Sequence, residues 1–304
     1  MGYTYFPGCS LKGTGRGYEE SLLAIFRRLG VSLRELDDWN CCGATSYMSI
    51  DEAQAFALAA RNLGLAEQQA GAGPNGAPHL VAPCSACYML LMKTQRYLNE
   101  HPDLRERAAA GLRAVGVPNA GTVQVRHPLD VLVNDVGLER IAQQVTAPLK
   151  GLKVACYYGC QIVRPFATFD SPWAPGSMDR LIEALGATAV PWPLKTRCCG
   201  GTLIGTVPPV GLRLSHILLH EAQRRGAEVM VTLCALCQFN LECYQDEMTR
   251  RFRETVHLPV VYFTQLIGRA FGIPDGELGL QRVLVPLACA GCAAAGAAGT
   301  AAPG

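Results

Sequence analysis

The feature that most constrains this chain is a cysteine pattern that occurs twice. In each half a single cysteine is followed by an adjacent cysteine pair with a glycine, and then by a Cys-x-x-Cys pair. The two sets are Cys9, Cys41, Cys42, Cys84 and Cys87, and then Cys160, Cys198, Cys199, Cys234 and Cys237. Such self-similarity indicates two copies of one supersecondary unit. The sequence therefore predicts two domains, 1–148 and 149–285, followed by an Ala/Gly-rich tail, 286–304, which we expect to be disordered.

The segments between the cysteines predict an α/β fold. Short runs rich in aromatic and β-branched residues, GYTYFPGC and LKVACYYGC, end at the first cysteine of each set and are typical of strands. Helical patterns follow at 18–29 and 51–69, and again at 177–185 and 210–225. Alternating strands and helices imply parallel sheets. We therefore expect two pseudo-symmetric Rossmann-like domains whose cysteines gather at the carboxyl ends of the strands, where such sheets bind ligands.

Composition and charge exclude several classes of protein. The net charge is +2, from 27 basic and 25 acidic residues, whereas nucleic-acid-binding domains are strongly basic. No run of about 18 to 20 apolar residues predicts a membrane span. The N-terminus lacks the basic and apolar regions of a secretory signal. We expect a cytoplasmic protein that contacts a membrane only through partners, and whose thiols stay reduced.

Three uses of so many thiols are open. Structural zinc takes four ligands, and each half offers five. Inert buried cysteine explains single residues but not the same set twice. Iron–sulfur ligation remains, although cubane clusters often use compact Cys-x2-Cys runs that this chain lacks. Two adjacent cysteines reach one centre only where the backbone turns sharply, and Gly43 and Gly200 permit such a turn.

The motifs that contain the cysteines resemble those of a known protein family. FPGCS, NCCG and PCSAC in the first half, and YYGC, RCCGG and LCALC in the second, resemble the two CCG domains in the B-type subunit of heterodisulfide reductase. Related modules occur in class II benzoyl-CoA reductase complexes, sulfur-oxidation complexes and one type of succinate:quinone reductase. The resemblance extends from residue 1 to about 285. No dinucleotide-binding GxGxxG motif follows a predicted strand.

This resemblance implies a cofactor, a reaction and partners. Each CCG domain of the family holds a non-cubane [4Fe-4S] cluster, so the two sets of five cysteines would hold two such clusters. The implied function is that of a catalytic oxidoreductase subunit that reduces or forms a disulfide or persulfide substrate. The implied partners are a ferredoxin-like subunit with two cubane [4Fe-4S] clusters and a flavoprotein subunit. The alternative is an electron relay that passes electrons to a quinone or a partner enzyme.

Several residues near the motifs are secondary candidates. Lys12, Arg164, Lys195 and Arg197 lie within a few residues of the cysteines, where they could bind an anionic substrate or remain solvated surface cations. Both CCG motifs are intact and no basic amphipathic anchor is evident, which favours catalysis over a relay at a membrane.

Three histidines and two tryptophans are further candidates for a role at the site. His127 follows a predicted strand, where we expect it to begin a helix, with proton donation to a leaving thiolate as the alternative. His216 and His220 are spaced for zinc, but we expect them on a helix face without metal. Trp39 and Trp192 precede the cysteine pairs, and we expect them to shield the clusters from water.

Four cysteines lie outside the two sets. Cys156 corresponds to Tyr5 of the other half, so we expect it in a strand. Cys243 has helical spacing from the last Cys-x-x-Cys pair, and we expect it in the core, with a position beside the ligands as the alternative. Cys289 and Cys292 form a third pair in the tail, which we expect to have no function.

Overall fold

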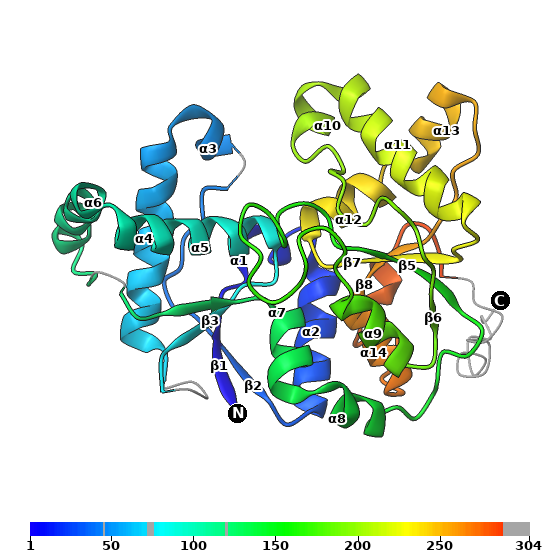
Figure 1. Ribbon diagram of the computed structural model, residues 1–304, viewed down its shortest axis with the longest axis horizontal. Helices are drawn as coiled ribbons and strands as arrows, with labels where there is room; N and C mark the ends of the chain where they lie inside the picture. The colour runs from blue at the N-terminus through cyan, green and yellow to red at the C-terminus, as the bar shows by residue number, and fades with distance from the viewer. Residues whose placement is uncertain (45, 72–75, 119–120, 288–304) are drawn as a thin grey trace, which may run out of the picture.

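The fold consists of two parallel sheets, one from each half of the chain (Figure 1). It is seen in a computed structural model that describes residues 1–44, 46–71, 76–118 and 121–287. The first sheet has the order β2-β1-β3-β4 and the second the order β6-β5-β7-β8, with every pairing parallel. The strands are β1 Gly2–Tyr5, β2 Ser32–Glu35, β3 His79–Val81, β4 Gln124–Arg126, β5 Lys153–Tyr157, β6 Thr188–Ala189, β7 Val229–Thr232 and β8 Val260–Tyr262.

Helices connect the strands in the same order in both halves. Those of the first half are α1 Gly8–Leu11, α2 Arg16–Arg28, α3 Ser46–Ile50, α4 Glu52–Gln69, α5 Ser85–Glu100, α6 Pro102–Ala114, α7 Pro128–Asp130, the π-helix η1 Val131–Val136 and α8 Leu138–Gln143. Those of the second half are α9 Ser177–Ala184, α10 Leu203–Thr206, α11 Pro208–Arg224, α12 Ala235–Glu242, α13 Gln245–Phe252, α14 Phe263–Ala270 and the 3-10 helix η2 Leu280–Arg282.

The pairing registers confirm that the halves are pseudo-symmetric. In the first half Tyr5 lies opposite Val81, three residues before Cys84. In the second half Cys156 lies opposite Val231, three residues before Cys234. Cys156 therefore occupies the place of Tyr5, as the sequence predicts, and it is fully buried.

A shared layer of helices joins the halves. Helix α14 of the second half packs on α2 of the first, and α8 of the first half packs on α9 of the second (Figure 1). The Ser21 and Thr264 hydroxyl oxygens are 2.6 Å apart in this layer. The Tyr18 ring stacks on the Tyr262 ring, with centroids 4.4 Å apart. The buried apolar side chains accordingly form one core that includes both sheets.

The predicted elements agree with the structure. The helix expected at 51–69 is α4, whose N-cap Asp51 accepts a hydrogen bond from the Gln54 backbone N–H at 3.1 Å. The helix expected at 210–225 is α11, which begins at Pro208, where a proline needs no backbone donor. The prediction of a parallel α/β fold is confirmed. Of the predicted tail, residues 288–304 lie outside the described residues.

A substitution at Gly268 tests how tightly α14 packs against its neighbours. A Cβ at this position would lie 2.1 Å from Cδ2 of Leu278, a fully buried side chain. We therefore expect Gly268→Ala to lower the free energy of unfolding by about 1–3 kcal/mol, as measured by denaturant unfolding.

Gly111→Ala is the matched control, because Gly111 lies in α6 with no atom within 4 Å of its would-be Cβ. There alanine should raise stability by roughly 0.5–1 kcal/mol. Equal effects of the two substitutions would contradict the packing of α14.

Candidate functional site

The ten cysteines of the two sets lie where strands end. Cys9 is in α1, directly after β1, and Cys84 is the N-cap of α5, after β3. Cys234 is the N-cap of α12, after β7. In a parallel sheet whose strand order reverses beside β1, these positions converge on one crevice. The structure therefore brings the sequence-predicted cysteines together at the sheet edges.

The sulfur atoms of each set form a line of contacts. In the first half Sγ of Cys9 lies 3.9 Å from Sγ of Cys41, and Sγ of Cys42 lies 3.1 Å from Sγ of Cys87. Cys41 and Cys42, and likewise Cys84 and Cys87, lie close enough for each pair to shift its own pKa values, and these neighbours complete the line.

The second half repeats that line. Cys199 and Cys237 have sulfurs 3.5 Å apart. Cys160 contacts Cys198, Cys198 contacts Cys199, and Cys237 contacts Cys234. The two sets of five therefore have the same internal order.

The two lines meet at the boundary between the halves. The thiols of Cys84 and Cys234 lie close enough to shift each other's pKa, that of Cys84 upward and that of Cys234 downward, so the ten sulfurs form one continuous series. Among the residues that the structure describes, no three histidine, cysteine or carboxylate side chains are placed to hold a single metal ion.

Glycines shape the loops that carry the cysteines. Gly43 and Gly200 have φ values of +84° and +100°, in the region that L-residues avoid, so each Cys-Cys pair turns as the sequence predicts. Gly8 has φ +65°, and a Cβ there would lie 3.1 Å from Sγ of Cys87. Gly159 has φ +70°, and its Cβ would lie 3.4 Å from Sγ of Cys237. The backbone after β1 and β5 therefore lies against the sulfurs of Cys87 and Cys237, more tightly at Gly8 than at Gly159.

The thiols share their protons unequally. The hydrogen bond from Cys42, followed by that from Cys9, lowers the pKa of Cys41 to about 2. Hydrogen bonds from Cys160 and Cys199 lower the pKa of Cys198 to about 2. The first cysteine of each adjacent pair is thus the one in which the thiolate, the form that ligates metal, is favoured.

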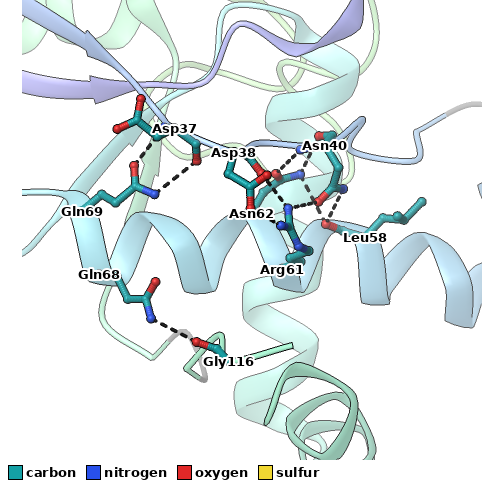
Figure 2. A network of polar contacts seen from close by, with 9 residues as sticks. All are labelled: Asp37, Asp38, Asn40, Leu58, Arg61, Asn62, Gln68, Gln69 and Gly116. Atoms are coloured by element: carbon teal, nitrogen blue, oxygen red, sulfur yellow. Dashed lines mark hydrogen bonds and ion pairs between the residues drawn. The ribbon is translucent and has the colours of Figure 1, made fainter. Parts of the chain in front are cut away.

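A polar network holds the first Cys-Cys loop on α4 (Figure 2). The side chain of the fully buried Asn62 accepts from the Asn40 backbone N–H at 3.0 Å and donates to the Asn40 carbonyl at 2.9 Å. The Asn40 side chain donates to the carbonyls of Cys41 and Leu58, at 2.8 and 3.1 Å. Arg61 donates to the Asn40 side-chain oxygen at 3.0 Å. The backbone directly before Cys41 is therefore fixed.

The second loop is held by different residues. Asn240 donates to Sγ of Cys199 at 3.5 Å and to the carbonyl of Gly201 at 2.8 Å. The Ser215 hydroxyl donates to the Cys199 carbonyl at 2.8 Å. The cysteine motifs do not predict the roles of Asn62, Asn240 and Ser215. Their one visible signal is a polar residue within an otherwise apolar helical stretch.

His127 bridges the halves behind the cysteines. Its ring is fully buried, and its Nδ1 accepts from the Leu129 backbone N–H at 3.1 Å. Nε2 therefore carries the proton, and it donates to the carbonyls of Pro83 at 2.9 Å and Leu233 at 3.3 Å. These carbonyls immediately precede Cys84 and Cys234. The expected helix start is confirmed, and the histidine also ties together the two segments that meet.

The tryptophans lie one layer away from the sulfurs. Trp39 packs edge-on against Phe6, with centroids 5.7 Å apart. Trp192 donates to the Cys156 carbonyl at 3.1 Å and packs against Tyr157. Both rings thus cover aromatic neighbours of the cysteine loops.

The cations predicted near the site are mostly engaged. Lys12 pairs with Glu19 at 2.6 Å and with a second carboxylate at 2.7 Å. Lys195 pairs with Asp179, and Arg164 donates to the Thr196 carbonyl. Arg197 lies on an exposed stretch beside the second loop.

The structure places the remaining candidate histidines and cysteines in three different ways. His216 and His220 stack with centroids 5.7 Å apart on one face of α11, and Glu254 lies 3.2 Å from Nε2 of His216. The core position expected for Cys243 is wrong, because this residue ends α12 and is exposed beside a cavity. The third pair, Cys289 and Cys292, lies outside the described residues.

Comparison with known proteins defines the class first. The model of the CCG cysteine-rich domain matches residues 3–92 and 154–242, one copy in each half. The chain is thus a tandem CCG protein, and it belongs to the family that includes the B-type subunit of heterodisulfide reductase. Membership of this family indicates that the chain is an iron–sulfur protein that functions in electron transfer.

Individual relatives match along nearly their whole length. The chain is 32% identical to the 8-methylmenaquinol:fumarate reductase membrane anchor subunit of Wolinella succinogenes, over 93% of this chain and 96% of that protein. It is 29% identical to the B-type subunit of the ferredoxin/F(420)H(2)-dependent CoB-CoM heterodisulfide reductase of Methanosarcina acetivorans, over 91% of each. Within the described residues, no helix is long and apolar enough to cross a membrane.

One solved structure shares the fold. A hypothetical protein from Helicobacter pylori superimposes with a TM-score of 0.73 at 12% sequence identity. The match includes 94% of this chain and 52% of that one, so this chain spans about half the length of the H. pylori protein.

The bridging role of His127 predicts a change in stability. His127→Phe introduces the residue found at the matching position, Phe263, and leaves the carbonyls of Pro83 and Leu233 without their donor. We expect a loss of about 1–3 kcal/mol in the free energy of unfolding at pH 7, measured by denaturant unfolding. The exposed His257→Phe is the control; an equal loss in both variants would contradict the bridge.

The same residue predicts a dependence on pH. Burial lowers the pKa of His127 from its usual 6.5 to about 4. Between these values the unfolded chain binds a proton that the folded chain does not, so the contribution of His127 is full above pH 6.5 and falls toward pH 4. We expect the drop in unfolding free energy between pH 7 and pH 5 to be smaller in His127→Phe than in the wild type. An unchanged drop would show that the ring is not held neutral.

Proposed function

We propose that this chain is the catalytic subunit of a heterodisulfide reductase-like complex and that it holds two non-cubane [4Fe-4S] clusters. With these clusters it would reduce or form a disulfide or persulfide substrate. The observation that carries the proposal is the contact between Cys84 and Cys234, which joins two like sets of five thiols. The first cluster would be held by Cys9, Cys41, Cys42, Cys84 and Cys87, and the second by Cys160, Cys198, Cys199, Cys234 and Cys237.

The donor sets fit such clusters. Each set supplies five soft thiol ligands, and in one of them the thiolate form is favoured. Backbone N–H groups of Ala44 and Gly200 donate to sulfur at 3.4 and 3.3 Å, and hydrogen bonds of this kind tune iron–sulfur centres. Bound clusters supply one-electron chemistry, so two neighbouring sets match the two electrons that a disulfide takes up.

The chain's own residues would control access to this chemistry. Cys9, Cys41 and Cys198 are exposed, whereas the cysteines at the meeting point of the two sets are buried. A small thiol or disulfide would therefore approach from the side of the exposed cysteines. The pKa of Cys198 is lowered chiefly by hydrogen bonds from Cys160 and Cys199, and the charge of the half-buried Arg164 lowers it further. Arg164 thus offers positive charge beside that approach.

The partners follow from the family. Relatives of this chain are named as subunits of reductases, so we infer that it works with partner subunits. We propose a ferredoxin-like subunit with two cubane clusters and a flavoprotein subunit as electron donors, and a cytoplasmic complex. We also propose 1–148 and 149–285 as the domain limits.

A second function is favoured by one specific observation. The relative from Wolinella succinogenes is named as a subunit of a menaquinol:fumarate reductase, and its similarity to this chain extends over 93% of the chain. In this alternative the two clusters relay electrons between a quinol and a partner enzyme. The alternative uses the same cysteines but gives the chain no sulfur substrate of its own.

Iron content is the first test of both functions. After anaerobic purification, two four-iron clusters correspond to about eight iron and eight sulfide per chain. Cys87→Ala should remove about half of both, measured by iron and acid-labile sulfide analysis. Cys243→Ala, outside the two sets, should leave both unchanged.

Zinc without sulfide would overturn the redox function. Electron paramagnetic resonance of the oxidised protein distinguishes the two functions. A thiol that changes the cluster signal supports chemistry on sulfur at the clusters. A signal that no thiol alters, together with reduction by a quinol, supports the relay.

A further inference from the structure

A cavity of about 200 Å³ lies at the boundary between the halves, apart from the cysteines of the two sets. It opens beside the end of α12 and is bordered by the segment that contains η2. Its lining includes Thr14, Gln238, Phe239, Cys243, Tyr262 and Leu284. None of these residues belongs to the two cysteine sets.

The matching place in the other half is filled. There Tyr88, which corresponds to Gln238, hydrogen-bonds Thr168 of the loop 161–176. Arg96 on the same helix stacks over Phe166 of that loop, with its guanidinium carbon 4.7 Å from the ring centroid. The corresponding loop of the first half, between α1 and α2, is short. The cavity therefore exists because one half lacks the loop that closes the other.

The lining suits a neutral molecule with hydrogen-bonding oxygens. The one cation of the described lining, Arg282, is paired with Glu20 through two bonds of 2.8 and 3.0 Å. Burial raises the pKa of Glu242, whose carboxyl accepts from the Leu284 backbone N–H at 2.8 Å. Gln238 and the Tyr262 hydroxyl add polar atoms. An anionic substrate finds no unpaired positive partner among the described lining residues.

The cavity lies one pair of rings from the meeting point of the cysteine sets. Tyr262 lines the cavity and stacks on Tyr18, at 4.4 Å between centroids. Both rings are buried, and both lie close enough to Cys84 and Cys234 for those thiols to raise their pKa after burial itself. A ring bound in the cavity would thus be separated from Cys84 and Cys234 by aromatic side chains and not by solvent.

We propose that this cavity binds the ring of a lipid-soluble quinone or its hydroquinone. A hydroquinone is neutral and flat and carries two hydroxyl groups, which match the polar atoms of Gln238, Glu242 and Tyr262, while Phe239 supplies an aromatic wall. Leu284, 64% exposed, gives the rim an apolar side on which a hydrocarbon tail can lie. The inference rests on the second function above, for which it supplies the substrate site.

The test is calorimetric titration of the anaerobically purified full chain with 2,3-dimethyl-1,4-naphthoquinone. Methyl groups occupy both ring positions beside the carbonyls of this probe, so thiols do not add there. We expect saturable binding at one site per chain. Cys243→Trp, which fills the cavity, should weaken binding by about tenfold or more, equivalent to about 1.4 kcal/mol.

Two controls make the result specific. Cys243→Ser keeps the cavity and removes the thiol, so its affinity should equal that of the wild type. Ile217→Trp places the same ring on an exposed face of α11, outside the cavity lining, and should also bind normally.

Iron and sulfide measured on the same samples distinguish a failure of the cavity inference from a failure of the proposed functions. A full complement of iron without quinone binding overturns the cavity inference and leaves the iron–sulfur function standing. Absence of iron and sulfide overturns the functions themselves. Binding that Cys243→Trp does not weaken, or that Cys243→Ser abolishes, also overturns the inference.

Discussion

The contact between Cys84 and Cys234 is the constraint on which the rest of the structure depends. Each of these cysteines begins a helix directly after a buried strand, so their distance is set by how the two sheets are placed. That placement is fixed by α2, α8, α9 and α14, which pack across the boundary between the halves. His127 then ties the segments before both cysteines to the same ring. The packing of apolar helices thus determines the separation of two sets of thiols.

Much of this arrangement could be predicted from the sequence because it follows from repetition. The cysteine spacing places each set after strands, and the alternating pattern fixes parallel sheets. Glycine after each Cys-Cys pair predicts a turn, and both glycines have positive φ. These features are local, or they are determined by the order of the elements.

The rest depends on contacts between distant parts of the chain. The sequence near His127 does not predict its hydrogen bond to the Leu233 carbonyl, because that contact forms only when the halves pack together. Asn62 and Asn240 hold corresponding loops from different helices, so the repeat gives no guide to them. Helical spacing predicts a core position for Cys243 because spacing alone does not reveal the cavity beside it.

The shared layer of helices has a consequence for the history of the fold. The last helices of each half cover the first helix of the other, so α2 and α9 find their apolar partners across the boundary. A protein made of one such half would leave that face open to water. It would gain a stable core only by pairing with a second copy, whose cysteines would then meet in the same way. The duplicated chain is therefore equivalent to a symmetric dimer whose two halves have been fused, and fusion freed each half to acquire its own loop.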